Sequence, residues 1–158
     1  MITIKGIKDE DFVNYKEPSM FIAFPCCTWK CEKECGMQVC QNSTLATTKN
    51  IKIESEEIVE RYMNNTITKA FVFGGLEPFD TWRDLITLVK VIRAKTLDDI
   101  VIYTGYEEWE IDNLVQWLYE YPNIIIKYGR FLPNQRSHYD EVLGVYLASD
   151  NQYAEKIS

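Results

Sequence analysis

The sequence predicts a single α/β domain with a mostly parallel sheet. Its 158 residues match the size of one ordinary domain, and a hydrophobic content of 46% is enough to form a core. Short apolar runs alternate with amphipathic stretches, and the chain contains no internal repeat or low-complexity tract. This alternation of strands and helices is typical of α/β folds with mostly parallel sheets. We therefore expect residues 1–158 to form one domain.

Apolar runs predict the strands of this sheet. The runs cover residues 20–24, 70–73, 100–103 and 123–126, and a fifth strand is expected at residues 143–146. Pro25 ends the first run, Gly74 and Gly75 end the second, and Thr104 and Gly105 follow the third.

Apolar residues at helical spacing predict three amphipathic helices between these strands. The first begins with Ser55 as N-cap, followed by two acidic residues in its first turn. The second begins with Asp80 as N-cap, and the third ends before Pro122. The apolar faces contain Ile58, Val59 and Tyr62 in the first helix, Trp82, Leu85, Ile86 and Val89 in the second, and Ile111, Leu114, Val115 and Leu118 in the third.

Charge and hydropathy argue against two classes of partner. The formal net charge is -7, whereas a protein that binds many phosphates needs a basic surface. No stretch approaches the ~18 consecutive apolar residues of a membrane span, and the first ten residues are too charged for a signal peptide. We expect a cytoplasmic protein that has neither nucleic acid nor a membrane as its main partner.

The cysteines are concentrated in one segment. Their odd number and the expected reducing compartment argue against a disulfide framework. Free buried thiols, a structural zinc site and an iron–sulfur site are the three alternatives. Charged residues between the cysteines disfavour a dry core, and a zinc site would usually have a second pair of ligands further along the chain. A tight cluster of thiolates suits iron–sulfur ligation best. All five cysteines fall within fifteen residues, at Cys26, Cys27, Cys31, Cys35 and Cys40.

Three chemically unusual loops follow predicted strands. They are the cysteine segment, the Gly74-Gly75 turn and the Thr104-Gly105 turn. With right-handed crossovers, the loops after parallel strands open on one edge of the sheet. Ligands bind outside the carboxyl ends of such strands. The sequence therefore predicts a ligand site at this edge.

Several motifs match one known family in order and position. They are the C-x-x-x-C pair Cys27 and Cys31, Cys40-Gln41-Asn42, Asp11-Phe12-Val13-Asn14, Gly74-Gly75-Leu76-Glu77-Pro78, Tyr103-Thr104-Gly105-Tyr106 and Ser149-Asp150-Asn151-Gln152. The chain resembles the small activating proteins of anaerobic (class III) ribonucleotide reductase, which are radical S-adenosylmethionine enzymes. The resemblance covers nearly the whole chain.

The cysteine spacing departs from the C-x-x-x-C-x-x-C pattern of this family. Eight residues separate Cys31 from Cys40, and Cys35 lies between them. The Gln-Asn pair that follows Cys40 favours this residue as the third ligand. The resemblance thus implies Cys27, Cys31 and Cys40 as metal ligands, with Cys35 as the alternative third ligand. Residues 127–131 also depart from the family pattern, so no role is assigned to them.

The resemblance implies a 4Fe-4S cluster and S-adenosylmethionine as cofactors. Three thiolates would leave one iron open for the amino and carboxylate groups of S-adenosylmethionine, so no catalytic side chain beyond the cluster is implied. Gly74 and Gly75 are expected to let the backbone approach the methionine end, and Glu77 to accept a hydrogen bond from its ammonium. Thr104 and Gly105 are expected to contact the adenosyl part. Taken alone, both motifs also fit ordinary strand-ending turns.

The same resemblance implies a partial (β/α) barrel of the radical S-adenosylmethionine type. The implied activity is to generate a glycyl radical in the large subunit of an anaerobic ribonucleotide reductase, with an electron donor such as flavodoxin. Two alternatives stay open. The chain is a radical S-adenosylmethionine enzyme acting on another peptide or protein, or it is a non-catalytic metal-binding module that holds an iron–sulfur cluster or zinc.

Overall fold

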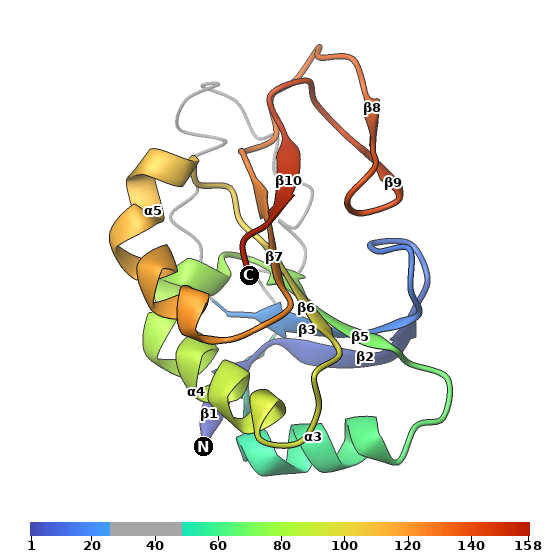
Figure 1. Cartoon of the computed structure of the whole chain (residues 1–158), viewed down its shortest axis with the longest axis vertical. Coiled ribbons are helices and arrows are strands. Elements are labelled where there is room, and N and C mark those ends of the chain that lie inside the picture. The colour runs from blue at the N-terminus through green and yellow to red at the C-terminus, as the bar shows by residue number, and fades with distance from the viewer. Residues whose placement is uncertain (26–48) are drawn as a thin grey trace.

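A six-stranded mixed sheet lies at the centre of the fold (Figure 1). The structure, a computed structural model, describes residues 1–25 and 49–158. The elements are β1 (Ile2–Ile4), β2 (Gly6–Asp11), β3 (Ser19–Phe24), β4 (Ile51–Ile53), α3 (Ser55–Met63), β5 (Ala70–Gly75), the 3-10 helix η1 (Pro78–Thr81), α4 (Trp82–Arg93), β6 (Asp99–Tyr103), α5 (Glu108–Val115), the 3-10 helix η2 (Gln116–Glu120), β7 (Ile124–Tyr128), β8 (His138–Asp140), β9 (Val145–Leu147) and β10 (Tyr153–Lys156).

The strand order of this sheet is β10-β7-β6-β5-β3-β2. The four central strands pair in parallel, β3 with β5, β5 with β6 and β6 with β7. The outer strands β2 and β10 each pair antiparallel with their neighbour. The predicted α/β class with a mostly parallel central sheet is therefore confirmed. Because the central strands are parallel, their carboxyl ends all lie at one edge.

Each face of the sheet is covered by a different kind of structure. Alternate side chains of β5 point to opposite faces, as the period of two in a strand requires. Phe71 and Phe73 pack in one cluster with the apolar sides of α3, α4 and α5. Ala70 and Val72 pack on the other face with Tyr15 and with the region of the β8-β9 hairpin. Figure 1 shows the three helices on one side of the sheet and this hairpin on the other.

Three predicted details of the elements are wrong. Glu54, and not Ser55, is the N-cap of α3, and neither residue makes a capping hydrogen bond through its side chain. Asp80 does not cap α4, because it lies inside η1 and Thr81 precedes α4. The fifth strand, predicted at residues 143–146, is β9, which pairs with β8 in a separate hairpin. β10 instead completes the main sheet, beside β7.

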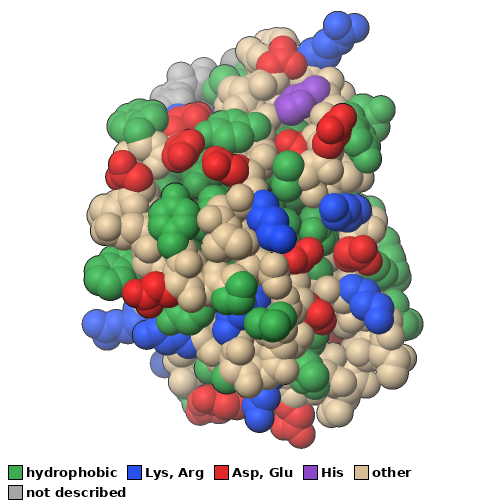
Figure 2. Space-filling view, viewed as in Figure 1, with side chains coloured by type: hydrophobic (Ala, Val, Ile, Leu, Met, Phe, Trp, Pro, Cys, Tyr) green, Lys and Arg blue, Asp and Glu red, His purple; other side chains and the backbone are tan. Residues whose placement is uncertain are grey.

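Charged side chains are distributed over the surface without a large basic area on the face shown in Figure 2. Acidic and basic side chains are interspersed there with hydrophobic ones. Within the described ranges, no helix has both the length and the apolar character needed to span a membrane.

Candidate functional site

A cavity opens at the edge where the parallel strands β5, β6 and β7 end. Its volume is about 360 Å³, within the range of roughly 300–1,000 Å³ that is usual for small-molecule sites. The five residues predicted to bind the cofactor all line it, namely Gly74, Gly75, Glu77, Thr104 and Gly105. The structure thus brings the two predicted loops together in one cavity, although it does not test what they bind.

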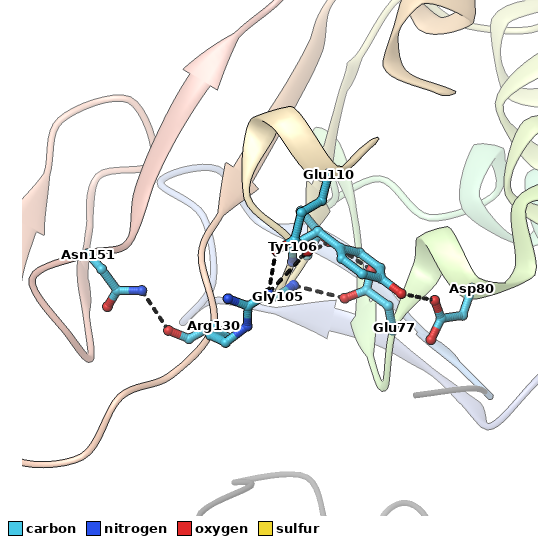
Figure 3. Close-up of polar contacts among 8 residues, drawn as sticks. Glu77, Asp80, Gly105, Tyr106, Glu110, Arg130 and Asn151 are labelled. Carbon is cyan, nitrogen blue, oxygen red and sulfur yellow. Dashed lines mark hydrogen bonds and ion pairs between the residues drawn. The ribbon is translucent and has the colours of Figure 1, made fainter. Parts of the chain in front are cut away.

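Glu77 connects the loop after β5 to the loop after β6. Its Oε1 accepts a hydrogen bond from the hydroxyl of Thr104 at 2.8 Å and one from the backbone N–H of Phe79 at 3.2 Å. Its Oε2 accepts one from the backbone N–H of Gly105 at 2.8 Å. The side chain is buried, with only 5% of the residue exposed. Glu77 therefore fixes the relative position of the two loops (Figure 3).

Burial also changes the acidity of Glu77. Loss of hydration raises the pKa of this carboxyl to about 7, although its three hydrogen bonds oppose the shift. The nearby Asp80 raises the pKa further through its negative charge. A carboxylate has about four acceptor positions, and three donors of the described residues already reach this one. Three of these acceptor positions are therefore occupied by donors from the described residues.

Gly75 and Gly105 differ in the space that is available for a side chain. Gly75 has φ +82°, and a Cβ there would lie 2.7 Å from the Cα of Ala23 in β3. Gly75 is therefore required by the close packing of two strands, without reference to any ligand. A Cβ on Gly105 would meet only ordinary contacts, 3.6 Å from Glu77 Oε2 and 3.7 Å from the Cβ of Arg130. Gly105 is thus the position where a small side chain would narrow the cavity without disturbing the strands.

Two basic residues that the sequence interpretation left without a role also line the cavity. Lys127 and Arg130 are both buried, at 5% and 8% exposure. Arg130 Nη2 donates to both carboxylate oxygens of Glu110 at 2.8 and 3.0 Å, and Figure 3 shows this pair beside Gly105. Lys127 Nζ donates to the carbonyl of Gly129 at 2.8 Å. The sequence could not predict that these two residues line the cavity, because the contacts of Arg130 with Glu110 and of Lys127 with Gly129 depend on the path of the turn that follows β7.

The predicted cluster ligands Cys27, Cys31 and Cys40, and the alternative ligand Cys35, lie outside the described residues. The start of their segment is nevertheless located, since β3 ends at Phe24 beside the glycine loop. The carbonyl of Phe24 accepts a hydrogen bond from the N–H of Leu76 at 3.2 Å. Among residues 1–25 and 49–158, no group of three His, Cys, Asp or Glu side chains could hold a metal ion. The assignment of the cysteines as ligands thus stays a prediction.

Comparison with protein families matches the chain to the 4Fe-4S single cluster domain, over residues 19–152. The chain belongs to this family. The matched range begins with β3, includes every cysteine and ends at Gln152. Membership in the 4Fe-4S single cluster domain family indicates that the protein binds an iron–sulfur cluster, as the sequence predicted. No curated protein and no solved structure matches the chain.

Proposed function

We propose that this 4Fe-4S domain is a radical S-adenosylmethionine activase, with its sheet serving as a shortened (β/α) barrel. The proposed substrate protein is the large subunit of an anaerobic ribonucleotide reductase, in which a glycyl radical would be generated in the cytoplasm. The proposed electron donor is a protein such as flavodoxin. When bound, a reduced 4Fe-4S cluster with one open iron supplies the electron that cleaves S-adenosylmethionine to methionine and a 5′-deoxyadenosyl radical.

The observation that supports this proposal is the bridged pair of loops at the cavity. Glu77 joins the β5 loop to the β6 loop beside the end of β3, where the cysteine segment begins. A metal-bound ligand would have to span from that segment to these loops. The cavity wall combines a buried carboxylate with apolar side chains such as Phe131 and Leu147. A buried hydrogen-bond acceptor beside apolar side chains suits a ligand that carries both an ammonium group and a nucleoside.

Each residue of the proposed site has a limited task. Glu77 would accept a hydrogen bond from the ligand ammonium, for which its ionised form is needed. The backbone at Gly105 and the Thr104 hydroxyl hold that carboxylate in place. Gly129 and Arg130, in the turn after β7, would form part of the wall beside the ligand. None of these groups has to react, because the protein supplies position and shielding while the cofactor supplies the chemistry.

Gly105→Ala tests the cavity directly. The added methyl group would lie beside Glu77 Oε2 and Arg130, in the space assigned to the ligand. We expect S-adenosylmethionine to bind the anaerobically reconstituted variant about tenfold more weakly than the native protein, a typical effect of overpacking one methyl group. Gly6→Ala is the matched control, because a Cβ at Gly6 would meet nothing within 4 Å. Titration calorimetry measures the affinity, and equal affinities for the two variants would exclude this cavity as the binding site.

The reaction is tested with the reconstituted native protein. Reductant, S-adenosylmethionine and the candidate reductase are incubated without oxygen. We expect 5′-deoxyadenosine by chromatography and a glycyl doublet by electron paramagnetic resonance. Cleavage without the glycyl signal would indicate a different peptide or protein substrate. If a protein with a full, reduced cluster cleaves no S-adenosylmethionine, the chain is a metal-binding module and the proposal is wrong.

A further inference from the structure

The turn that follows β7 is held by several hydrogen bonds. Gly129 has φ +98°, and its N–H donates to the carbonyl of Tyr106 at 3.0 Å. Its own carbonyl accepts from Lys127 Nζ at 2.8 Å and from Gln152 Nε2 at 3.3 Å. The carbonyl of Arg130 accepts from Asn151 Nδ2 at 2.8 Å, as Figure 3 shows. Two side-chain amides from the segment before β10 thus hold two successive carbonyls of this turn.

The segment that provides these amides is itself fixed. Ser149 is fully buried, and its hydroxyl donates to Asn151 Oδ1 at 2.6 Å. The N–H of Ser149 donates to Gln152 Oε1 at 3.1 Å. Each amide therefore has its oxygen bound to Ser149 and its nitrogen directed at the turn. The two amide orientations follow from this network, because reversing either one would break both of its hydrogen bonds.

The turn forms part of the cavity wall. Gly129 and Arg130 line the cavity, and a Cβ on Gly105 would lie 3.7 Å from the Cβ of Arg130. Asn151 does not line it, so its effect on a ligand would be indirect. A Cβ at Gly129 would lie 3.1 Å from the carbonyl oxygen of Asn151, which shows how closely the two segments pack.

We propose that Asn151 is a positioning residue, which holds the Gly129–Arg130 turn as a preformed wall of the ligand cavity. Gln152 and Ser149 complete this amide clamp. A wall that is already in place needs no ordering when the ligand binds, so less binding free energy is lost. The inference rests on the proposed function only in the choice of S-adenosylmethionine as the ligand.

Asn151→Asp tests the clamp with almost no change in shape. The variant keeps the oxygen that accepts from Ser149, but it places a second oxygen against the carbonyl of Arg130. Asn123→Asp is the matched control, because Asn123 Nδ2 also donates to a backbone carbonyl, that of Leu97, at 2.7 Å. Asn123 immediately precedes β7, at the opposite end of this strand from the cavity. Both substitutions remove one amide hydrogen bond and add one negative charge.

Two measurements are made on the reconstituted holoprotein. In hydrogen–deuterium exchange without ligand, we expect Asn151→Asp to accelerate exchange in the peptide that covers residues 128–132, and Asn123→Asp to leave it unchanged. In titration with S-adenosylmethionine, we expect Asn151→Asp to bind about fivefold more weakly than the control, the size of one lost hydrogen bond. The added negative charge would by itself attract the cationic ligand, so weaker binding would come from geometry.

The outcomes separate this inference from the proposed function. Unchanged exchange in Asn151→Asp would overturn the clamp. Faster exchange with the same affinity as the control would limit Asn151 to a structural role and overturn its positioning role. If the native holoprotein binds no S-adenosylmethionine, the proposed function fails, and the exchange experiment alone decides whether the turn is held by Asn151.

Discussion

Glu77 links two sequence motifs that lie far apart in the chain. The G-G-x-E-P motif and the T-G motif are separated by 27 positions between Glu77 and Thr104, yet a hydrogen bond of 2.8 Å joins the two residues. The proximity of the two motifs could be predicted from the topology, because both follow parallel strands of one sheet. The burial of Glu77 was not predictable, since it depends on the side chains that surround the carboxylate in the folded chain.

The raised pKa of Glu77 predicts a pH dependence of stability. In the folded protein the pKa of this carboxyl is about 7, compared with its ordinary value of 4.5. The folded state therefore holds a proton that the unfolded chain has released, and the stabilisation present below pH 4.5 is lost as the pH rises through 7. We expect the free energy of unfolding to fall over this range, with Glu77 contributing roughly 3 kcal/mol at most. Denaturant titrations at several pH values measure this slope.

Substitution isolates the contribution of this one carboxyl. Glu77→Gln has no proton to release, so its stability should vary less with pH than that of the native protein. Glu60→Gln, at an exposed position of α3, is the control and should keep the native slope. A slope in Glu77→Gln as steep as the native one would assign the pH dependence to other groups.

At the scale of elements, the central strands were the easiest to predict. The strands β3, β5, β6 and β7 begin and end within two residues of the predicted runs, because they are buried on both faces and read as continuous apolar segments. The strands β1, β2, β4, β8 and β10 were missed. β2, for example, has the sequence GIKDED and is mostly half-buried, so it lacks the apolar pattern that marks a central strand.

The pairing of β3 with β5 predicts the effect of a methyl group at Gly75. Gly75→Ala would place a Cβ 2.7 Å from the Cα of Ala23 and 2.9 Å from the N of Phe24, in a residue with φ +82°. The clash and the strained backbone should together lower the free energy of unfolding by about 2–4 kcal/mol. Denaturant unfolding measures the loss, and Gly6→Ala should change stability by less than about 1 kcal/mol.

The Gly75 prediction also limits how this loop can be studied. If a Gly75 variant bound the ligand more weakly, the cause would be the displacement of β3 by the added side chain and not a side chain that blocks the cavity. A Gly75→Ala protein as stable as the native one would show that β3 and β5 separate easily at this edge. Gly105 is the appropriate position for a steric test, as its Cβ would contact the cavity wall without overlap.

At the scale of the whole molecule, the loops that follow the parallel strands lie at one edge of the sheet, and the cysteine segment follows β3 in the sequence. The family match over residues 19–152 includes both this edge and all five cysteines. The sequence predicted the iron–sulfur cluster from the concentration of thiols. The cysteines lie outside the described residues, so substitution experiments have to identify which of them bind the cluster.

Cysteine substitutions test the ligand set of the intact protein. Replacing Cys27, Cys31 or Cys40 with Ala should abolish the broad visible absorption of the reconstituted protein, because a cluster with two thiolates is poorly held. Cys26→Ala and Cys35→Ala are the controls and should keep most of the absorption. Iron and sulfide analysis gives the cluster content independently. Loss of the cluster in Cys35→Ala but not in Cys40→Ala would make Cys35 the third ligand.

The two outer strands of the sheet affect how copies of this protein meet in solution. In the described part of the chain, β2 and β10 form the edges of the six-stranded sheet, where backbone groups can recruit a strand from another molecule. Lys8 in β2 and Glu155 and Lys156 in β10 are exposed charges on these strands, and the pairing of β2 shifts register between Lys8 and Asp11. Charges and bulges of this kind discourage edge-to-edge aggregation. A second copy of the chain would therefore meet charged or irregular strands at both edges of this sheet, which do not favour its extension across molecules.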